Sequence, residues 1–588
     1  MRDYLNQLRG DKERFVVVAE VYPGCRLEEI LRGMGQEEFS HVFNAETAVK
    51  DSHLIAAQLH DQLADDRVFG KLAPLQTLED FFDIPKLEAF RREVSSCEKG
   101  MILMVGTGAS LVTEGDAVVY FDLPRREIEN RYTAGMGSFH GDNEKDEYLV
   151  KFKRGYFSEW RAADRLKAKL LPTVQVMVAS SAESHPTMCT GEAFRAAIRQ
   201  TASRPFRLVP YFAPEVWGGQ WMKQVFGLDP HCEKYAWGFD GVPEENSLVF
   251  NIDGVLLEFP AMDLVLMEPQ ALLGEGVFHR FGAEFPIRFD LLDTIHGQNL
   301  SLQVHPTTSY IAREFGLPYT QDESYYILDT QGEESSVYLG LKTGVTKESL
   351  EAALRNAQEK GTFDAESYVN QFPVKKHDHV LIPAGTVHCS GKGTMVLEIS
   401  ATPYIFTFKM WDWGRVGWDG RPRPIHIERA MDNIQWERDT QWVKDNLIHQ
   451  EWVAAQGEGW KEEHIITVVG TTLSLAVTSI AAYVVSKTEL KGIKLIRGAF
   501  GSVLVVGQGS LGGSNCGSVK RPATGHPTGG PQSLGNVLDQ SAVWGGWRTG
   551  LPHPGRRVLG PYNRVRFWMG SGEGIFMPVL WIPGIAQQ

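Results

Sequence analysis

Buried strands and amphipathic helices alternate in the first part of the chain. Continuous apolar runs typical of buried strands occur at residues 15–21 (FVVVAEV), 100–108 (GMILMVGTG) and 116–124 (DAVVYFDLP). Residues 78–94 and 158–171 instead carry apolar residues at helical spacing. Because this alternation is typical of layered α/β structures, we predict an α/β domain over residues 1–204.

The pattern changes near Pro205, where short apolar runs are separated by Gly and Pro. Examples are residues 246–260 (NSLVFNIDGVLLEFP) and 394–415 (TMVLEISATPYIFTFKMWDWGR). Many short strands joined by turns favour an antiparallel sandwich or jelly roll, which we expect over residues 205–462. One helical insertion, at about residues 343–370, includes the amphipathic run KESLEAALRNAQEKG. The fold class predicted for the whole chain is therefore mixed.

Residues 463–588 are expected to form a second β-rich part. The uncharged stretch 465–486 is long enough to span a membrane, but its Thr, Ser and β-branched residues favour two buried strands. From about residue 511 the chain is dense in Gly and Pro, with no period of a helix or strand. This shift indicates either a flexible tail or a frameshifted reading of the C-terminus.

Composition excludes several classes of protein. Hydrophobic residues make up 43% and charged residues 22% of the 588 residues, as in globular proteins. A net charge of −14 argues against nucleic acid as a partner. The six cysteines are scattered without a C-x-x-C pair, so we expect neither disulfides nor a zinc ribbon, and we expect a cytoplasmic protein. The N-terminus does not have the pattern of a secretory signal, and no membrane partner is expected.

The turn at residues 105–110 (VGTGAS) has the glycine content of a phosphate-binding loop. A lone glycine-rich turn is more often a tight loop, and the chain has no G-x-x-x-x-G-K-[ST] motif. With Asp122 and the basic residues Arg125, Arg126 and Arg131, the region loosely resembles nucleoside and uridine kinases. Because the phosphate-loop lysine is missing, the resemblance implies a degenerate kinase-like domain without kinase activity, and the basic residues equally suit a solvated surface.

Four residues of the second part form a candidate metal site: Gln303, His305, Glu323 and His388. Gln303 and His305 stand two apart in LSLQVHP, so on a strand both side chains point to the same face. A carboxylate and a second imidazole would complete a mixed nitrogen and oxygen shell suited to Zn²⁺. A single His in an apolar strand is usually a structural residue, so the assignment depends on the four residues together.

The ordered motifs around these residues resemble those of the class I (cupin-type) mannose-6-phosphate isomerases. The resemblance covers residues 207–440 and includes PEVWGG (214–219), FPIRFDLLD…LSLQVHP, GLKTGVTKESL, PVKKHDHVLIPAGTVH and LEISATPYIFTFKMWDWGR. It implies a cupin fold, with residues 463–588 as its second half. It also implies that Gln303, His305, Glu323 and His388 bind zinc, and that Arg415 is the active-site arginine.

One departure concerns the substrate. The family usually has a lysine two residues before the glutamate ligand, where this chain has Gln321, which we keep as a candidate for binding the substrate. Lys409 and Lys342 are the nearest cations in matching motifs, and Trp217 is a candidate for lining a sugar pocket. Arg415 suits a phosphate or enediolate contact, or an ion pair with Asp412.

The resemblance implies interconversion of mannose 6-phosphate and fructose 6-phosphate, or of a related sugar phosphate, through an enediol. The general base stays open among Glu284, Asp290, His296 and His377. The alternative is a metal-binding cupin that binds a sugar phosphate without turnover.

Overall fold

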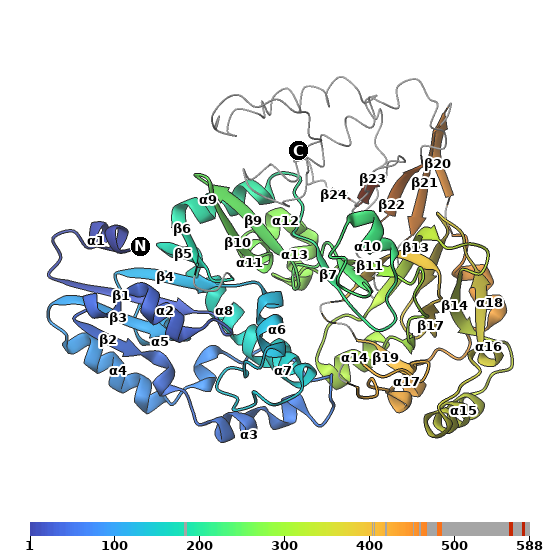
Figure 1. Ribbon diagram of the computed structural model, residues 1–588, viewed down its shortest axis with the longest axis horizontal. Coiled ribbons are helices and arrows are strands. Elements are labelled where there is room, and N and C mark those ends of the chain that lie inside the picture. The colour runs from blue at the N-terminus through green and yellow to red at the C-terminus, as the bar shows by residue number, and fades with distance from the viewer. Residues whose placement is uncertain are drawn as a thin grey trace.

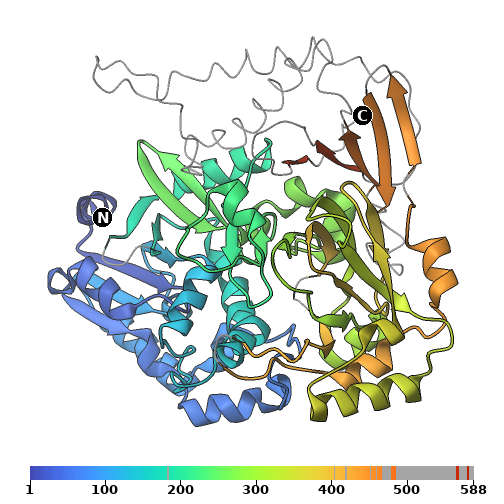
Figure 2. The same ribbon diagram turned by 45° about the vertical axis from the view of Figure 1, so that its right-hand side comes forward.

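The computed structural model describes residues 1–181, 185–402, 404, 406–417 and 420–450, and the strand backbones at 452–457, 460–466, 479–484, 564–568 and 579–581. An N-terminal α/β unit and a β-rich unit lie side by side (Figures 1 and 2). In the described residues, no helix is both long and apolar enough to cross a membrane.

A six-stranded sheet in the order β2-β3-β1-β4-β5-β6 forms the centre of the N-terminal unit. The first five strands in this order are parallel, and β6 is antiparallel to β5. The strands are β1 (Arg14–Val21), β2 (His41–Asn44), β3 (Gly100–Gly106), β4 (Ala117–Asp122), β5 (Val176–Ala179) and β6 (Thr187–Thr190). The apolar runs predicted as strands are confirmed as β1, β3 and β4.

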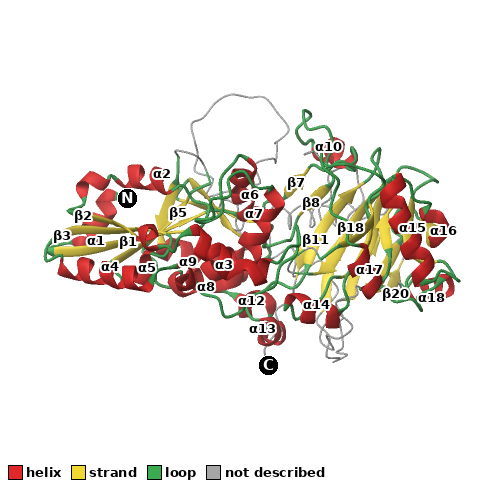
Figure 3. Cartoon of the chain, turned by 90° about the horizontal axis from the view of Figure 1, so that it is seen from below, coloured by secondary structure: helices red, strands yellow, loops and turns green. Residues whose placement is uncertain are grey.

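Helices cover both faces of this sheet (Figure 3). In β1, Phe15 and Val17 pack with Leu5 and Ile30 on one face, whereas Val16 and Val18 belong to the large core on the other. This two-sided burial explains why the strand is apolar without alternation. The helices are α1 (Arg2–Arg9), α2 (Leu27–Met34), α3 (Ser52–Leu63), α4 (Ile84–Ser96), α5 (Ala109–Val112), α6 (Arg125–Thr133), α7 (Tyr148–Arg154), a π-helical turn (Gly155–Glu159), α8 (Trp160–Leu170) and α9 (Gly191–Ala202).

A later segment of the chain packs against the N-terminal unit. It comprises the hairpin of β9 (Ser247–Ile252) and β10 (Val255–Pro260), followed by α11 (Met262–Met267), α12 (Pro269–Leu273) and α13 (Glu275–Phe281). Phe194 of α9 contacts Phe259 of β10, with ring centroids 4.9 Å apart. The buried ammonium of Lys167 in α8 lies 2.7 Å from Asp122 and 2.8 Å from Asp263 of α11. The domain boundary near residue 205 stays a prediction.

The VGTGAS turn binds carboxylates of the protein itself. The amides of Gly108 and Ser110 donate to Glu20 at 2.6 and 2.7 Å, and the amide of Thr107 donates to Glu46 at 3.0 Å. Burial, opposed by the bonds from Ser110 and Gly108, raises the pKa of Glu20 to about 7. Three amides that a phosphate would need are thus already paired, and the kinase-like assignment stays a prediction.

The β-rich unit contains two antiparallel sheets, as the short-strand pattern predicted. One has the order β16-β13-β18-β11-β8-β7 and the other β15-β14-β17-β12-β19. The first sheet consists of β7 (Tyr211–Ala213), β8 (Trp237–Phe239), β11 (Arg288–Asp293), β13 (Asp322–Thr330), β16 (His379–Ile382) and β18 (Thr394–Ala401). The second consists of β12 (Leu302–Val304), β14 (Ser336–Leu341), β15 (Val369–Pro373), β17 (His388–Ser390) and β19 (Phe408–Trp411).

Helices lie at the edges of this unit: α10 (Trp221–Phe226), α14 (Thr308–Phe315), α15 (Lys347–Lys360), α16 (Ala365–Tyr368), α17 (Ile427–Asn433) and α18 (Thr440–Asn446). The helix predicted at 347–361 is confirmed as α15. It begins at a capping box of Thr346 and Ser349, and Gly361 ends it in the left-handed conformation.

The strands that follow form a further sheet, in the order β20-β21-β22-β23-β24. They are β20 (Trp452–Gly457), β21 (Trp460–Ile466), β22 (Ser479–Val484), β23 (Arg564–Trp568) and β24 (Val579–Trp581). The stretch 465–486 contains the end of β21 and all of β22, as expected for strands rather than a membrane helix. Apart from β23 and β24, the tail after residue 511 lies outside the described residues, and the second-half assignment stays a prediction.

Candidate metal centre

Strand pairing places three of the predicted site residues on one face of the second sheet. Gln303 of β12 pairs with His388 of β17 on one side and with Lys409 of β19 on the other. Directly opposed residues of antiparallel strands point to the same face, so these side chains are neighbours. His305, two residues after Gln303, follows the end of β12 on that same face.

The turn before His388 is tied to His305. Gly385 of the IPAG turn has φ +84°, and its amide donates to the His305 carbonyl at 3.0 Å. A Cβ atom at this position would lie 2.8 Å from the Asn433 carbonyl oxygen, so the turn requires glycine.

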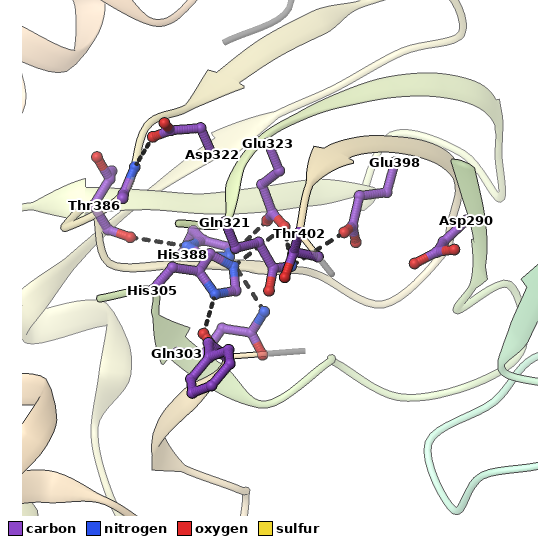
Figure 4. Close-up of polar contacts among 12 residues, drawn as sticks. Asp290, Gln303, His305, Gln321, Asp322, Glu323, Thr386, His388, Glu398 and Thr402 are labelled. Carbon is purple, nitrogen blue, oxygen red and sulfur yellow. Dashed lines mark hydrogen bonds and ion pairs between the residues drawn. The ribbon is translucent and has the colours of Figure 1, made fainter. Parts of the chain in front are cut away.

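Both imidazoles are held with Nδ1 against a backbone carbonyl, which leaves Nε2 available to a metal. The Nδ1 atom of His305 donates to the Phe406 carbonyl at 2.8 Å, and the Nδ1 atom of His388 donates to the Thr386 carbonyl at 2.8 Å (Figure 4). A carbonyl can only accept, so the proton of each neutral ring is on Nδ1 and each Nε2 carries a free lone pair. Backbone partners of this kind orient His ligands in known metal sites.

Both Nε2 atoms point at Glu323, which comes from the opposite sheet. They lie 3.2 Å (His305) and 2.8 Å (His388) from its carboxylate oxygens, and all three side chains are fully buried. Burial raises the pKa of Glu323, but hydrogen bonds and positive charge from His305 and His388, when these rings are protonated at Nε2, outweigh it and keep this pKa well below its usual value. With both rings in the neutral Nδ1–H form, Glu323 instead faces two Nε2 lone pairs, an arrangement that a cation between the three groups would stabilise.

The chemistry of these donors fits a zinc ion. The ligand atoms of His305, Glu323 and His388 lie within 4.8 Å of one another, the only such group of His, Cys, Asp and Glu in the part of the chain that is described. Gln303 is the fourth candidate, with its amide nitrogen 3.2 Å from His388 Nε2. If the side-chain amide of Gln303 were rotated by half a turn, its oxygen instead of its nitrogen would face the ligand atoms of the other three residues. Two imidazoles, a carboxylate and an amide oxygen form a nitrogen and oxygen shell suited to Zn²⁺.

Gln321 lies beside Glu323, and its role in binding the substrate stays a prediction. Its amide nitrogen donates to Glu323 at 3.0 Å and lies 3.4 Å from Glu398. Gln321 is 4% exposed, so it is part of the wall of the site. The place where the family has a lysine is therefore neutral and bonded to two carboxyl groups.

Two further carboxyl groups lie on the same inner face of the first sheet. Asp290 of β11 and Glu398 of β18 are opposite each other in the strand register, and both are buried. Burial raises the pKa of Asp290 to about 6, against the pull of Arg288. Burial, then the charges of Glu323 and Asp290, raise the pKa of Glu398 well above its usual value.

Sequence reasoning included Asp290 as one of four candidate bases and missed Glu398. The signal for Glu398 is a charged residue at an otherwise apolar strand centre, TMVLEISA. The other three candidates make contacts elsewhere. Glu284 contacts Tyr319 at 3.4 Å, His296 contacts Gln331 at 2.9 Å, and His377 contacts Tyr326 at 2.8 Å.

A cationic group lies on the other side of Gln303. Arg415 donates to the Asn299 carbonyl at 2.7 Å and forms an ion pair with Asp412 at 2.6 Å, and Arg423 contacts the same carboxylate at 3.0 Å. Burial, and then repulsion from Arg423, lower the pKa of Lys409 to about 8. The structure therefore contains the ion pair between Arg415 and Asp412 that the sequence offered as an alternative role for Arg415. A catalytic role of Arg415 stays a prediction.

The remaining candidates lie further from the metal group. Trp217 is fully buried and packs edge-on against Trp237, with ring centroids 5.3 Å apart. Its backbone carbonyl accepts a hydrogen bond from the amide of Gln298. Lys342 is exposed after the end of β14. The sugar-binding role of Trp217 stays a prediction.

Comparison with known proteins finds two kinds of likeness. Residues 1–203 match the family model described as "Domain of unknown function (DUF8485)". Over 234 residues the chain is 28% identical to the probable mannose-6-phosphate isomerase GmuF of Bacillus subtilis, which is 40% of this chain and 69% of that protein. Over 232 residues it is 29% identical to the mannose-6-phosphate isomerase of Streptococcus mutans, covering 39% and 67% of the two chains.

Solved structures give a weaker likeness. The mannose 6-phosphate isomerase of Bacillus subtilis aligns with a TM-score of 0.36 and 22% identity, over 46% of this chain and 77% of that one. A zinc-bound mannose 6-phosphate isomerase aligns with a TM-score of 0.33 and 16% identity, over 44% and 79% of the two chains. The sequence comparison is the informative one: over about 40% of its length, the chain is homologous to mannose-6-phosphate isomerases.

Proposed function

We propose that this protein is a zinc-dependent aldose–ketose isomerase that interconverts mannose 6-phosphate and fructose 6-phosphate, or a closely related pair of sugar phosphates. The observation that carries the proposal is the pair of imidazoles with Nδ1 bonded to backbone carbonyls and Nε2 facing Glu323. The homology to mannose-6-phosphate isomerases supports the reaction class.

Gln303, His305, Glu323 and His388 would hold the ion. Bound there, Zn²⁺ would supply Lewis acidity for the oxygens of the sugar carbonyl and enediolate. The residues around it divide the site into a cationic and an acidic side, and these sides have different tasks.

The cationic side suits the phosphate. Lys409 pairs with Gln303 in the strand register, and Arg415 and Arg423 both form ion pairs with Asp412, just after the end of the same strand. A phosphate bound to Lys409 would orient the sugar with its reacting carbons toward the metal ligands. Arg415 is retained as the candidate that stabilises developing negative charge there.

The acidic side suits proton transfer. Isomerisation moves a proton between C1 and C2, which requires a group that accepts it and returns it. Asp290 and Glu398 are a pair of buried carboxyl groups on the same sheet face as Glu323, and we assign the proton transfer to this pair. The amide of Gln321 is hydrogen-bonded to Glu323 and Glu398 and would hold the carboxyl groups of these two residues in place.

A coupled assay of the purified chain with mannose 6-phosphate tests the proposal. Turnover should disappear when a chelator removes the metal and should return when Zn²⁺ is added. Bound metal without turnover on mannose 6-phosphate or other hexose phosphates would refute the isomerase and favour a non-catalytic cupin that binds a sugar phosphate. Gln321, neutral where the family carries a lysine, is the residue that favours this second candidate.

A further inference from the structure

The contact between the two units of the chain is centred on Phe69, in the loop between α3 and α4. Phe69 is 1% exposed although its loop is a connecting segment. Its ring is stacked on Phe406 with centroids 5.2 Å apart and an interplanar angle of 13°. It also meets Phe408 edge-on at 5.3 Å and Phe315 at 5.6 Å. An N-terminal side chain is thus enclosed by the aromatic residues of the β-rich unit.

Phe406 connects this contact to His305, one of the candidate metal ligands. Its backbone carbonyl is the acceptor that holds His305 Nδ1 at 2.8 Å and so sets the tautomer and direction of that imidazole. Residues 406 and 407, described just before β19, belong to no strand. We therefore expect the position of this carbonyl to depend on how the Phe406 side chain packs.

Other aromatic residues of the N-terminal unit hold the same segment. Phe157 lies 6.1 Å from Phe406 and 5.0 Å from Tyr404 between ring centroids, and Tyr156 lies 4.4 Å from Tyr404. The hydroxyl of Tyr404 donates to the Val68 carbonyl at 3.1 Å. Tyr404 and Phe406 are therefore packed against the N-terminal unit and not only against the sheets of the β-rich unit.

The loop that carries Phe69 is itself fixed on both sides. The buried ammonium of Lys153 donates to the Leu63 carbonyl at 2.9 Å. One oxygen of Asp66 accepts from the amides of Val68 and Phe69 at 2.8 and 2.9 Å, and the other lies 3.4 Å from Arg429. The amide of Leu72 donates to the Phe315 carbonyl at 2.9 Å. These bonds tie the loop to both units.

We propose that the N-terminal domain, whose family has no assigned function, positions the metal site: Phe69 fixes Phe406, and the Phe406 carbonyl fixes His305. Phe69 is a positioning residue, because it acts through Phe406 and touches no metal ligand. The inference rests on the proposed metal site but not on the identity of the sugar. In this structural role the N-terminal domain requires no bound nucleotide.

Metal affinity of the full chain, measured without substrate, tests this proposal. Zn²⁺ is titrated in competition with a chromophoric chelator, and the visible spectrum of the Co²⁺-loaded protein reports the ligand geometry. Phe69→Ala should weaken Zn²⁺ binding by about tenfold or more, as removal of groups that orient metal ligands does, and should alter the Co²⁺ spectrum. Phe69→Leu, which keeps most of the apolar volume, should recover affinity to within about threefold of the original chain.

Phe194→Ala is the matched control. Phe194 is equally buried in the N-terminal unit, but its ring packs on Phe250 and Phe259 rather than on Tyr404 or Phe406. It should lower the unfolding midpoint and leave zinc affinity unchanged. An unchanged affinity in Phe69→Ala, or an equal loss in Phe194→Ala, overturns the proposal.

Three further outcomes are interpreted as follows. If Phe69→Ala does not fold, Tyr404→Phe is judged in its place, because it removes only the hydroxyl bonded to Val68. It should weaken zinc binding by more than the threefold margin allowed for Phe69→Leu, and an affinity within that margin overturns the proposal. If the unmodified chain binds no zinc, the metal site itself fails and this inference fails with it. Zinc binding without isomerase activity would refute the proposed function alone.

Discussion

Removing His388 is the most direct perturbation of the candidate metal centre, because the structure provides a matched control. His388 and His379 are both buried imidazoles, 0% and 1% exposed, on strands of the same unit. His388 faces Glu323 at 2.8 Å. His379 pairs with Tyr326 in the strand register, so it points to the opposite face of the sheet from Glu323. Burial lowers the pKa of His379 to about 3, so it is neutral.

The expected loss follows from the number of ligands. Zinc sites with four protein ligands bind with roughly 10–16 kcal/mol at neutral pH. One ligand of four therefore accounts for about 3 kcal/mol, which is a loss of roughly 100-fold in affinity. His388→Ala should lose at least this much, because it also leaves Glu323 with one partner fewer. His379→Ala removes a buried imidazole of the same size and should keep zinc affinity within about threefold, the range of ordinary structural substitutions away from a site.

Competition with a chromophoric chelator gives the zinc affinity, and elemental analysis gives the stoichiometry. Circular dichroism and denaturant unfolding establish that both variants are folded, so that loss of metal is not loss of structure. Stoichiometric zinc in His388→Ala at the original affinity would refute the ligand set. Equal losses in both variants would show that metal binding reports stability and not coordination.

Three further predictions concern single charged residues. The pKa of Lys409 is about 8, so its ammonium group is charged below that pH, and the KM for mannose 6-phosphate should rise as the pH increases through about 8. A KM that does not change with pH contradicts the proposal that Lys409 binds the phosphate. A KM that still rises in Lys409→Met contradicts it as well. Burial raises the pKa of Asp66, but hydrogen bonds from His426 and two backbone amides outweigh it and lower this pKa to about 2. The unfolded value is about 3.9, so the folded state gains about 2 kcal/mol of stability above pH ~4. This stability is lost as the pH falls toward 2. Unfolding of Asp66→Asn should therefore lack this dependence, whereas Asp65→Asn, at an exposed position, should keep it. Lys167→Met leaves two buried aspartates without their cation and should cost about 3–5 kcal/mol in denaturant unfolding, against less than about 0.5 kcal/mol for the exposed Lys169→Met on the same helix.

The parts of this structure that the sequence predicts are those set by local periodicity. Strand β1 can be predicted from its continuous apolar run, because both of its faces are buried. Helix α15 can be predicted because it has an apolar stripe, a capping box and a terminal glycine. Gln303 and His305 are predictable as a pair because a strand has a period of two. The addition of Glu323 and His388 required the ordered motifs, since no local rule brings together residues so far apart in the chain.

What local pattern did not predict depends on contacts between distant segments. Glu398 reads as one polar residue in an apolar strand until its pairing with Asp290 places it on the inner face. The VGTGAS turn has the composition of a phosphate loop, but Glu20 from β1 occupies its amides. Phe69 lies in a loop without period, and only the packing of the two units makes it a core residue. In each case the deciding partner is more than 60 residues away in sequence.

The two faces of the first sheet argue that its polar side was selected for function rather than for folding. Strands β11 and β18 place Leu291 and Leu397 in an apolar core on the outer face. On the inner face they place Arg288, Asp290 and Glu398, all at most 3% exposed. A buried polar group without a full set of hydrogen bonds costs roughly 1–3 kcal/mol, and an apolar inner face would avoid this cost. The polar groups extend from Glu323 along the sheet to Arg288, so the substrate site should extend along the same line. Substitutions at Arg288 should therefore change KM for the sugar while leaving zinc affinity intact.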